Sequence, residues 1–169
     1  MLISILIGTV SLILEVILSN FLPYLNNNLS LFTPMFSIVS LFFIYSFFKK
    51  DKYKYFIFSF IFGFVYDLFF TNLLFFNGIL FLGIAFLITL LYENLEINFL
   101  NIILEIIIII TVYELLTVFI ILIFNLVPIT PLKVLYKISH SLIINIIYGE
   151  ILYFIIKHLP KKYRSLSIN

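Results

Sequence analysis

The stretch YFIFSFIFGFVYDLFF, residues 55–70, decides the fold class, because it is apolar or weakly polar apart from one carboxylate, Asp67. A charge inside a hydrocarbon-spanning segment costs roughly 2.5–3.5 kcal/mol on insertion scales. A chain that keeps such a charge usually has a partner or a role for it. Gly63 lies four residues before Asp67, so a helix places the two residues near one face. The sequence therefore predicts a membrane helix whose acid is functional, structural or simply placed at the membrane edge.

The composition of the whole chain agrees with a membrane protein. Hydrophobic residues make up 64% of the 169 residues, charged residues only 11%, and the mean hydropathy is +1.26. Soluble domains carry about 25% charged residues, so this chain is expected to have lipid as its main solvent. Its length allows five or six spans of about 20 residues and no separate soluble domain. The absence of cysteine excludes disulfides and thiolate metal sites.

Six apolar segments are separated by proline and by polar or charged residues. We predict an all-α, polytopic membrane protein in which one transmembrane domain, residues 1–169, forms a compact six-helix bundle. The predicted spans are 2–22, 31–48, 55–70, 78–92, 99–124 and 139–156. The segment 131–140 alternates apolar and basic residues. It can be a short interfacial helix or the first turns of the last span.

Lysine and arginine predict the orientation. With six spans and a cytoplasmic amino terminus, eight basic residues lie inside and only two, Lys133 and Lys137, lie outside. The inner residues are Lys49, Lys50, Lys52, Lys54, Lys157, Lys161, Lys162 and Arg164. This asymmetry follows the positive-inside rule. Both termini are therefore predicted to be cytoplasmic.

Several other polar residues fall inside predicted spans. Glu15 belongs to a stripe of small residues in the first span, and Glu114 lies near the middle of the fifth. Ser141 and Asn145 share one face of the last span, whereas Glu150 lies on the other side. Two acids at membrane depth, Glu114 and Glu150, are typical of ion-coupled transporters. Because no inverted repeat or helix broken at mid-membrane is evident, hydrogen bonding between helices is the favoured interpretation.

Known catalytic and phosphate-binding motifs are absent from the sequence. It contains no His-Glu-x-x-His, no Gly-x-Ser-x-Gly and no glycine-rich phosphate loop, and its two histidines are His140 and His158. We therefore predict no enzymatic activity, no catalytic, cofactor-binding or metal-binding residues, and no nucleic-acid partner. Membrane lipid is the expected surrounding.

The middle of the chain resembles a known family. Gly63 and Asp67, followed by Asn77-Gly78 and then Gly83, are similar to the signature of the bacterial rod shape-determining membrane protein MreD. The last span, with Ser141 and Asn145 ahead of a basic end, is also similar to that family's final helix. Asp67 departs from many relatives in lacking a preceding glutamine. We expect its carboxylate to order the outer ends of the third and fourth spans, because a carboxylate can bind the free N–H groups of a nearby helix start at Asn77-Gly78.

The resemblance implies a non-enzymatic component of the cell-elongation machinery in the bacterial cytoplasmic (inner) membrane. The implied partners are an MreC-like single-span protein and, indirectly, MreB-like filaments and the synthases of lateral peptidoglycan. The family is thought to share a fold with the substrate-binding component of energy-coupling-factor transporters. A vitamin-binding component is therefore the alternative function, and an ion-coupled transporter using Glu114 and Glu150 and a lipid-binding scaffold are two further classes.

Overall fold

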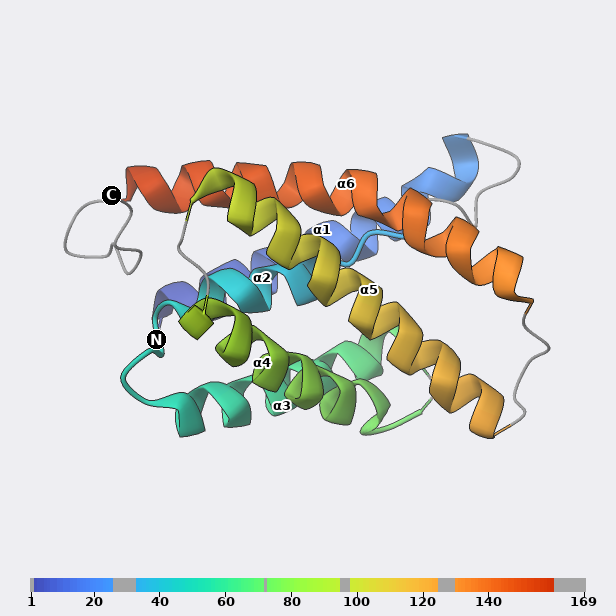
Figure 1. Ribbon diagram of the computed structural model, residues 1–169, viewed down its shortest axis with the longest axis horizontal. Coiled ribbons are helices and arrows are strands. Elements are labelled where there is room, and N and C mark those ends of the chain that lie inside the picture. Colours follow the sequence, from blue (N-terminus) through green and yellow to red (C-terminus); the bar gives the residue numbers. More distant parts are fainter. Residues whose placement is uncertain (1, 26–32, 72, 95–97, 125–129, 160–169) are drawn as a thin grey trace.

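The computed structural model describes residues 2–25, 33–71, 73–94, 98–124 and 130–159. Within these ranges the secondary structure is entirely α-helical. The six helices are α1 (Leu2–Leu25), α2 (Phe36–Tyr45), α3 (Lys52–Phe70), α4 (Phe76–Asn94), α5 (Phe99–Ile123) and α6 (Pro131–His158). Successive helices run in opposite directions along the bundle (Figure 1).

Five of these helices are long and apolar enough to cross a membrane. They are α1, α3, α4, α5 and α6, and each contains an apolar segment of 19 to 25 residues. Their surfaces carry many exposed large hydrophobic side chains, including Leu100 and Leu132, which is the pattern expected where lipid is the solvent. The prediction of an all-α, multi-pass membrane protein is therefore confirmed as far as helix content, length and apolar composition show.

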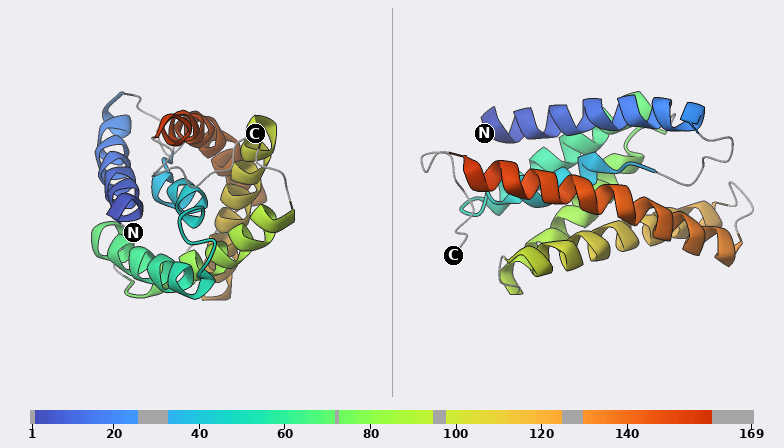
Figure 2. Two further views of the ribbon diagram at one scale, coloured as in Figure 1. Left: turned by 90° about the vertical axis from the view of Figure 1, so that its left-hand side faces the viewer. Right: turned by 90° about the horizontal axis from the view of Figure 1, so that it is seen from above.

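Helix α2 differs from the predicted span of residues 31–48. It has only 10 residues, all of them buried, and it follows an irregular segment at Thr33–Met35. Figure 2 shows α2 in the middle of the other helices when the bundle is seen along its length, and it packs against α1, α4, α5 and α6. A helix that is apolar on all sides belongs in a protein interior. The second element is therefore a short central helix and not a full-length, lipid-facing span.

The other boundaries lie close to prediction, except at α6. Residues 131–140 form the first turns of one continuous helix to His158, so this segment is not a separate interfacial helix. Pro131 occupies the first turn of α6, where the lack of an N–H group has no cost. Helix α3 begins three residues earlier than predicted because the Asp51 side chain caps it by accepting the backbone N–H of Lys54 at 3.2 Å.

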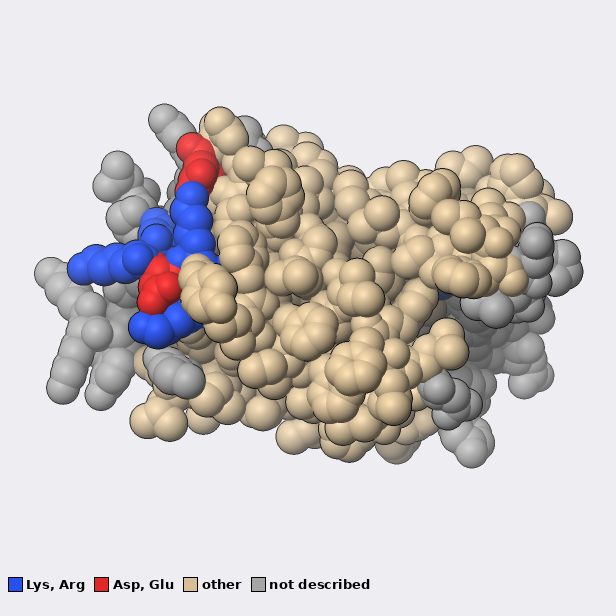
Figure 3. All heavy atoms as spheres, turned by 90° about the horizontal axis from the view of Figure 1, so that it is seen from below, with Lys and Arg blue, Asp and Glu red and all other residues tan. Residues whose placement is uncertain are grey.

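Charged side chains gather at one end of the bundle, which we call the charged end (Figure 3). The start of α1, the α2–α3 connection with Lys49–Lys54, and the end of α6 all lie there (Figure 1). Two ion pairs join these residues: Lys52 pairs with Glu93, and Lys54 pairs with Asp51 at 2.7 Å. Hydrogen bonds from Lys54 lower the pKa of Asp51. Lys161, Lys162 and Arg164 lie outside the described residues.

Candidate functional site

Asp67 lies in the last turn of α3 and is fully buried. Its carboxylate accepts the backbone N–H of Asn77 at 3.0 and 3.2 Å and the Asn77 side-chain N–H at 2.7 Å. The hydroxyl of Thr71 also lies 2.8 Å from Asp67 Oδ1. Asn77 is the second residue of α4, so its backbone N–H has no partner within the helix. Asp67 therefore caps α4 from the neighbouring helix, in the favourable direction for the helix dipole.

Gly63 allows the two helices to approach closely enough for this cap. A Cβ atom at Gly63 would lie 2.3 Å from the backbone oxygen of Asn77 and 2.9 Å from Cα of Gly78. Both are main-chain atoms, which cannot move aside as a flexible side chain can. Gly78 and Gly83 are less restricted, because a Cβ at Gly78 would make only ordinary contacts from 3.4 Å and one at Gly83 would meet nothing within 4 Å. Of these three glycines, Gly63 is the one that close packing requires.

Tyr113 connects the Asp67 cap to α5. Its hydroxyl donates to Oδ1 of Asn77 at 2.7 Å, while the amide nitrogen of the same side chain donates to Asp67. Asn77 thus joins α3, α4 and α5 through one buried side chain. The sequence analysis did not select Tyr113, although a tyrosine at membrane depth signals a hydroxyl that needs a partner.

Glu15 performs the same task at the start of α2. Its Oε2 accepts the backbone N–H of Ser37 at 2.8 Å, and its Oε1 accepts the hydroxyl of Tyr66 at 2.8 Å. Ser37 is the second residue of α2, which is the position that Asn77 holds in α4. Glu15 is fully buried. The two buried acids therefore occupy equivalent positions at the starts of two helices.

Asn145 of α6 holds the irregular segment that precedes α2. Its Oδ1 accepts the backbone N–H of Met35 at 2.7 Å. Its Nδ2 lies 3.0 Å from the Thr33 carbonyl oxygen and 2.7 Å from that of Ser141. Ser141 is buried one turn away, and its hydroxyl donates to the Ile138 carbonyl at 2.9 Å. These bonds satisfy backbone groups that water cannot reach in a membrane.

Glu114 pairs with Lys137, which approaches from α6. The Lys137 Nζ lies 2.8 Å from Oε2 of Glu114, and neither carboxylate oxygen of Glu114 has a hydrogen-bond partner among the described residues. Glu114 is fully buried, whereas the Lys137 side chain is 42% exposed. Sequence reasoning placed Lys137 at the membrane surface and therefore missed this pair.

Glu150 does not join Glu114 in one site. It is half-buried on α6, 13 residues beyond Lys137, which corresponds to about 20 Å along a helix. Glu105 is buried and lacks a hydrogen-bond partner within the described part of the chain. The arrangement therefore offers no paired acids of the kind that an ion-coupled transporter using Glu114 and Glu150 would need.

We expect Lys137→Ala to lower the free energy of unfolding by about 1–3 kcal/mol, less than for a fully buried pair because Lys137 is half-exposed. The reason is that the variant leaves the Glu114 carboxylate buried and unpaired. Lys54→Ala is the control, because it breaks an exposed ion pair worth at most about 1 kcal/mol. Denaturant unfolding of the detergent-solubilised protein measures both variants. Equal effects would show that the Glu114–Lys137 pair contributes no more than a surface contact.

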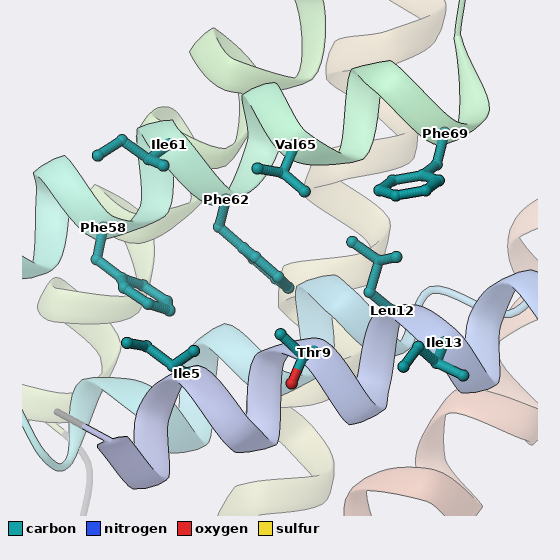
Figure 4. Close-up of a pocket in the computed structure, with 9 residues that line it drawn as sticks. All are labelled: Ile5, Thr9, Leu12, Ile13, Phe58, Ile61, Phe62, Val65 and Phe69. Carbon is teal, nitrogen blue, oxygen red and sulfur yellow. The ribbon is translucent and has the colours of Figure 1, made fainter.

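A groove lies between α1 and α3 (Figure 4). Its volume is about 490 Å³, and Thr9 contributes its one polar side chain. The hydroxyl of Thr9 donates to the Leu6 carbonyl at 3.1 Å, so it is not free for a ligand. The other lining residues are apolar: Ile5, Leu12, Ile13, Phe58, Ile61, Phe62, Val65 and Phe69. The groove can bind hydrocarbon surfaces and has no group suited to catalysis.

Metal-binding clusters of three or more His, Cys, Asp or Glu side chains are not found among the described residues. The candidate site therefore consists of two helix-capping acids, one ion pair and an apolar groove.

Comparison with known proteins gives one match. Residues 1–163 match the family model of the rod shape-determining protein MreD, and the chain therefore belongs to the MreD family. No curated protein and no solved structure matches the chain significantly.

Proposed function

We propose that this member of the MreD family is a non-enzymatic scaffold, which holds an MreC-like single-span partner and so supports lateral peptidoglycan synthesis. Membership of the family means a role in the machinery of rod shape. The scaffold role is supported by the buried acids, because Glu15 and Asp67 bind helix starts and Glu114 binds Lys137. These contacts organise the bundle and involve no reacting group.

The α1–α3 groove is the observation that best supports a partner helix. Apart from the hydrogen-bonded Thr9, its lining is hydrocarbon. Gly8 is buried beside the groove, and its ideal Cβ position is 3.2 Å from the Phe62 ring, so Gly8 packs against α3 within the bundle. We propose that the membrane helix of the partner packs into this groove.

The orientation is part of the same proposal. The charged end contains the α2–α3 connection, the start of α3 and the end of α6 (Figure 1), and these segments carry Lys49, Lys50, Lys52, Lys54 and Lys157. Lys137, near the start of α6, is paired with Glu114. The positive-inside rule then favours a cytoplasmic charged end. The protein would lie in the bacterial cytoplasmic membrane with both termini inside, near MreB-like filaments.

Co-purification with the MreC-like partner from membranes tests this function. We expect Thr9→Phe, which fills the groove, to reduce the recovered partner about tenfold, corresponding to about 1.4 kcal/mol. Val10→Phe is the matched control, because Val10 is an exposed neighbour on α1 that does not line the groove. We expect the control to retain the partner.

Two different failures can be distinguished in this experiment. Equal recovery with the two variants would exclude the groove as the binding surface but would leave the scaffold intact. No recovery with the unmodified protein would contradict the scaffold itself, most clearly if the same preparation bound a vitamin tightly.

A further inference from the structure

The α3–α4 hairpin is short compared with the helices beside it. Helix α3 begins at the charged end, where its Lys52 pairs with Glu93 of α4. From Tyr55 to Phe70 it rises only about 24 Å at about 1.5 Å per residue, whereas membrane hydrocarbon is about 30 Å thick. Helices α5 and α6, with 25 and 28 residues, extend beyond the α3–α4 connection (Figure 1). The connection therefore ends below the level that the neighbouring helices reach.

The surface of this connection is apolar. Leu73, Leu74 and Phe75 are 52%, 60% and 51% exposed, and none of the described residues from Thr71 to Phe76 is charged. Turns that face water usually carry Gly, Asn, Asp or Ser. Phe75 even adopts a positive φ of 67°, a conformation that bulky residues rarely take. The polar residues of this connection are Thr71 and Asn72, and the side chains that it exposes at positions 73–75 are apolar.

A recess of about 320 Å³ lies between the connection and the end of α5. Its lining consists entirely of apolar side chains: Leu73, Leu74, Phe75, Phe76, Ile79, Ile120 and Phe124. Protein–protein interfaces normally combine an apolar centre with several hydrogen bonds. A recess without polar side chains at this depth is suited to hydrocarbon chains.

Hydrogen bonds within the protein allow the chain to reverse direction at membrane depth. Irregular backbone exposed to lipid is not tolerated unless its polar groups have partners inside the protein. Here Asp67 accepts the N–H of Asn77, and the N–H of Thr71 donates to the Asp67 carbonyl at 3.2 Å. The Thr71 hydroxyl lies 3.2 Å from the Leu73 carbonyl oxygen, and its single proton serves either this oxygen or Asp67. The N–H of Ile79 donates to the Phe75 carbonyl at 3.1 Å.

We propose that Leu73, Leu74 and Phe75 of the α3–α4 connection are immersed in the hydrocarbon of the leaflet opposite the charged end, and that lipid acyl chains fill the recess against α5. The buried Asp67 cap supports this position because it binds the free N–H group of Asn77, at the start of α4, without water. The leaflet thins on the α3–α4 side, since a hydrophobic segment shorter than the membrane draws the bilayer inward. This inference does not depend on the partner-binding function.

Single cysteines provide a direct test, because the natural chain contains none. Leu74→Cys places a thiol on the connection. Leu132→Cys is the matched control, because both leucines are exposed, at 60% and 77%, and belong to the end opposite the charges. The purified protein is reconstituted without any partner into phosphatidylcholine–phosphatidylglycerol vesicles. It is labelled with a charged, membrane-impermeant maleimide, and labelling in sodium dodecyl sulfate corrects for thiol reactivity.

We expect the Leu74→Cys thiol to react at least about tenfold more slowly than the Leu132→Cys thiol, because hydrocarbon excludes charged reagents. A nitroxide attached at each cysteine gives the second measurement. The label at position 74 should be more accessible to oxygen than to a polar nickel chelate, and the label at position 132 should show the reverse. Equal maleimide labelling would overturn the proposal by placing the turn in water. Low accessibility of position 74 to both oxygen and nickel would also overturn it, because it would indicate contact with protein.

Discussion

Replacing Asp67 with alanine is expected to lower the free energy of unfolding by about 3 kcal/mol or more. The variant removes the acceptor for the backbone and side-chain N–H groups of Asn77, both of which are buried. An orphaned buried donor costs about 1–3 kcal/mol, and water cannot replace the carboxylate at membrane depth. Denaturant unfolding in detergent measures the loss. The variant should also weaken the contact between α4 and Tyr113 of α5, because Asn77 of α4 accepts the Tyr113 hydroxyl.

Glu105→Ala is the matched control, because it also removes a buried carboxylate from a helix. The Glu105 oxygens lack hydrogen-bond partners in the described structure. Removing them therefore leaves no described N–H or O–H group without its acceptor. We expect a change within about 1 kcal/mol, because loss of packing is offset by removing an unsatisfied polar group. If Glu105→Ala destabilised the protein as much as Asp67→Ala, the cap would have no special importance.

Gly63→Ala is expected to have the second-largest effect, a loss of about 2–3 kcal/mol. The new Cβ would lie 2.3 Å from the Asn77 backbone oxygen, so α3 and α4 must separate and the Asp67 hydrogen bonds must lengthen. Overpacking of this kind costs typically about 1–3 kcal/mol. The loss should exceed the gain of about 1 kcal/mol that alanine brings to a helix interior. Thermal and denaturant unfolding of the solubilised variant provide the measurement.

Gly83→Ala isolates the steric part of this prediction. Both glycines lie inside helices, but a Cβ at Gly83 meets nothing within 4 Å. The control should therefore be neutral or stabilising by up to about 1 kcal/mol. A Gly63→Ala variant as stable as Gly83→Ala would contradict the close approach of α3 and α4.

The family resemblance and the membrane class were both accessible from the sequence. Residues 1–163 match the MreD family, as Gly63, Asp67 and the glycines after them suggested. The capping of the fourth helix by Asp67 was also predictable, because an acid at one helix end and an Asn-Gly start nearby are close in the chain. Such short-range relations depend on local geometry, which a sequence carries directly.

Other features depended on packing between distant segments. Residues 31–48 are apolar over a length close to that of a membrane span, yet they contain the buried ten-residue helix α2. Its lack of any polar face was a usable signal, but a lipid-facing helix has the same composition. The partners of Glu15 and Glu114 come from other helices, and Met35, a partner of Asn145, comes from the irregular segment before α2. No spacing along the chain identifies these partners.

By itself, the sequence determined that this protein is a helical membrane protein. Its side chains are mostly hydrocarbon, and a segment surrounded by lipid must hydrogen-bond its own backbone groups, as a helix does. It also determined where the chain concentrates its charge and which acid belongs to the family signature. The tertiary structure alone decided that α2 lies inside the bundle and that Glu15 holds the start of that helix. The physical reason is that a buried carboxylate takes whichever free N–H group packing brings within about 3 Å. Which N–H group the carboxylate binds therefore depends on how the helices pack together, and the sequence of a single helix does not reveal it.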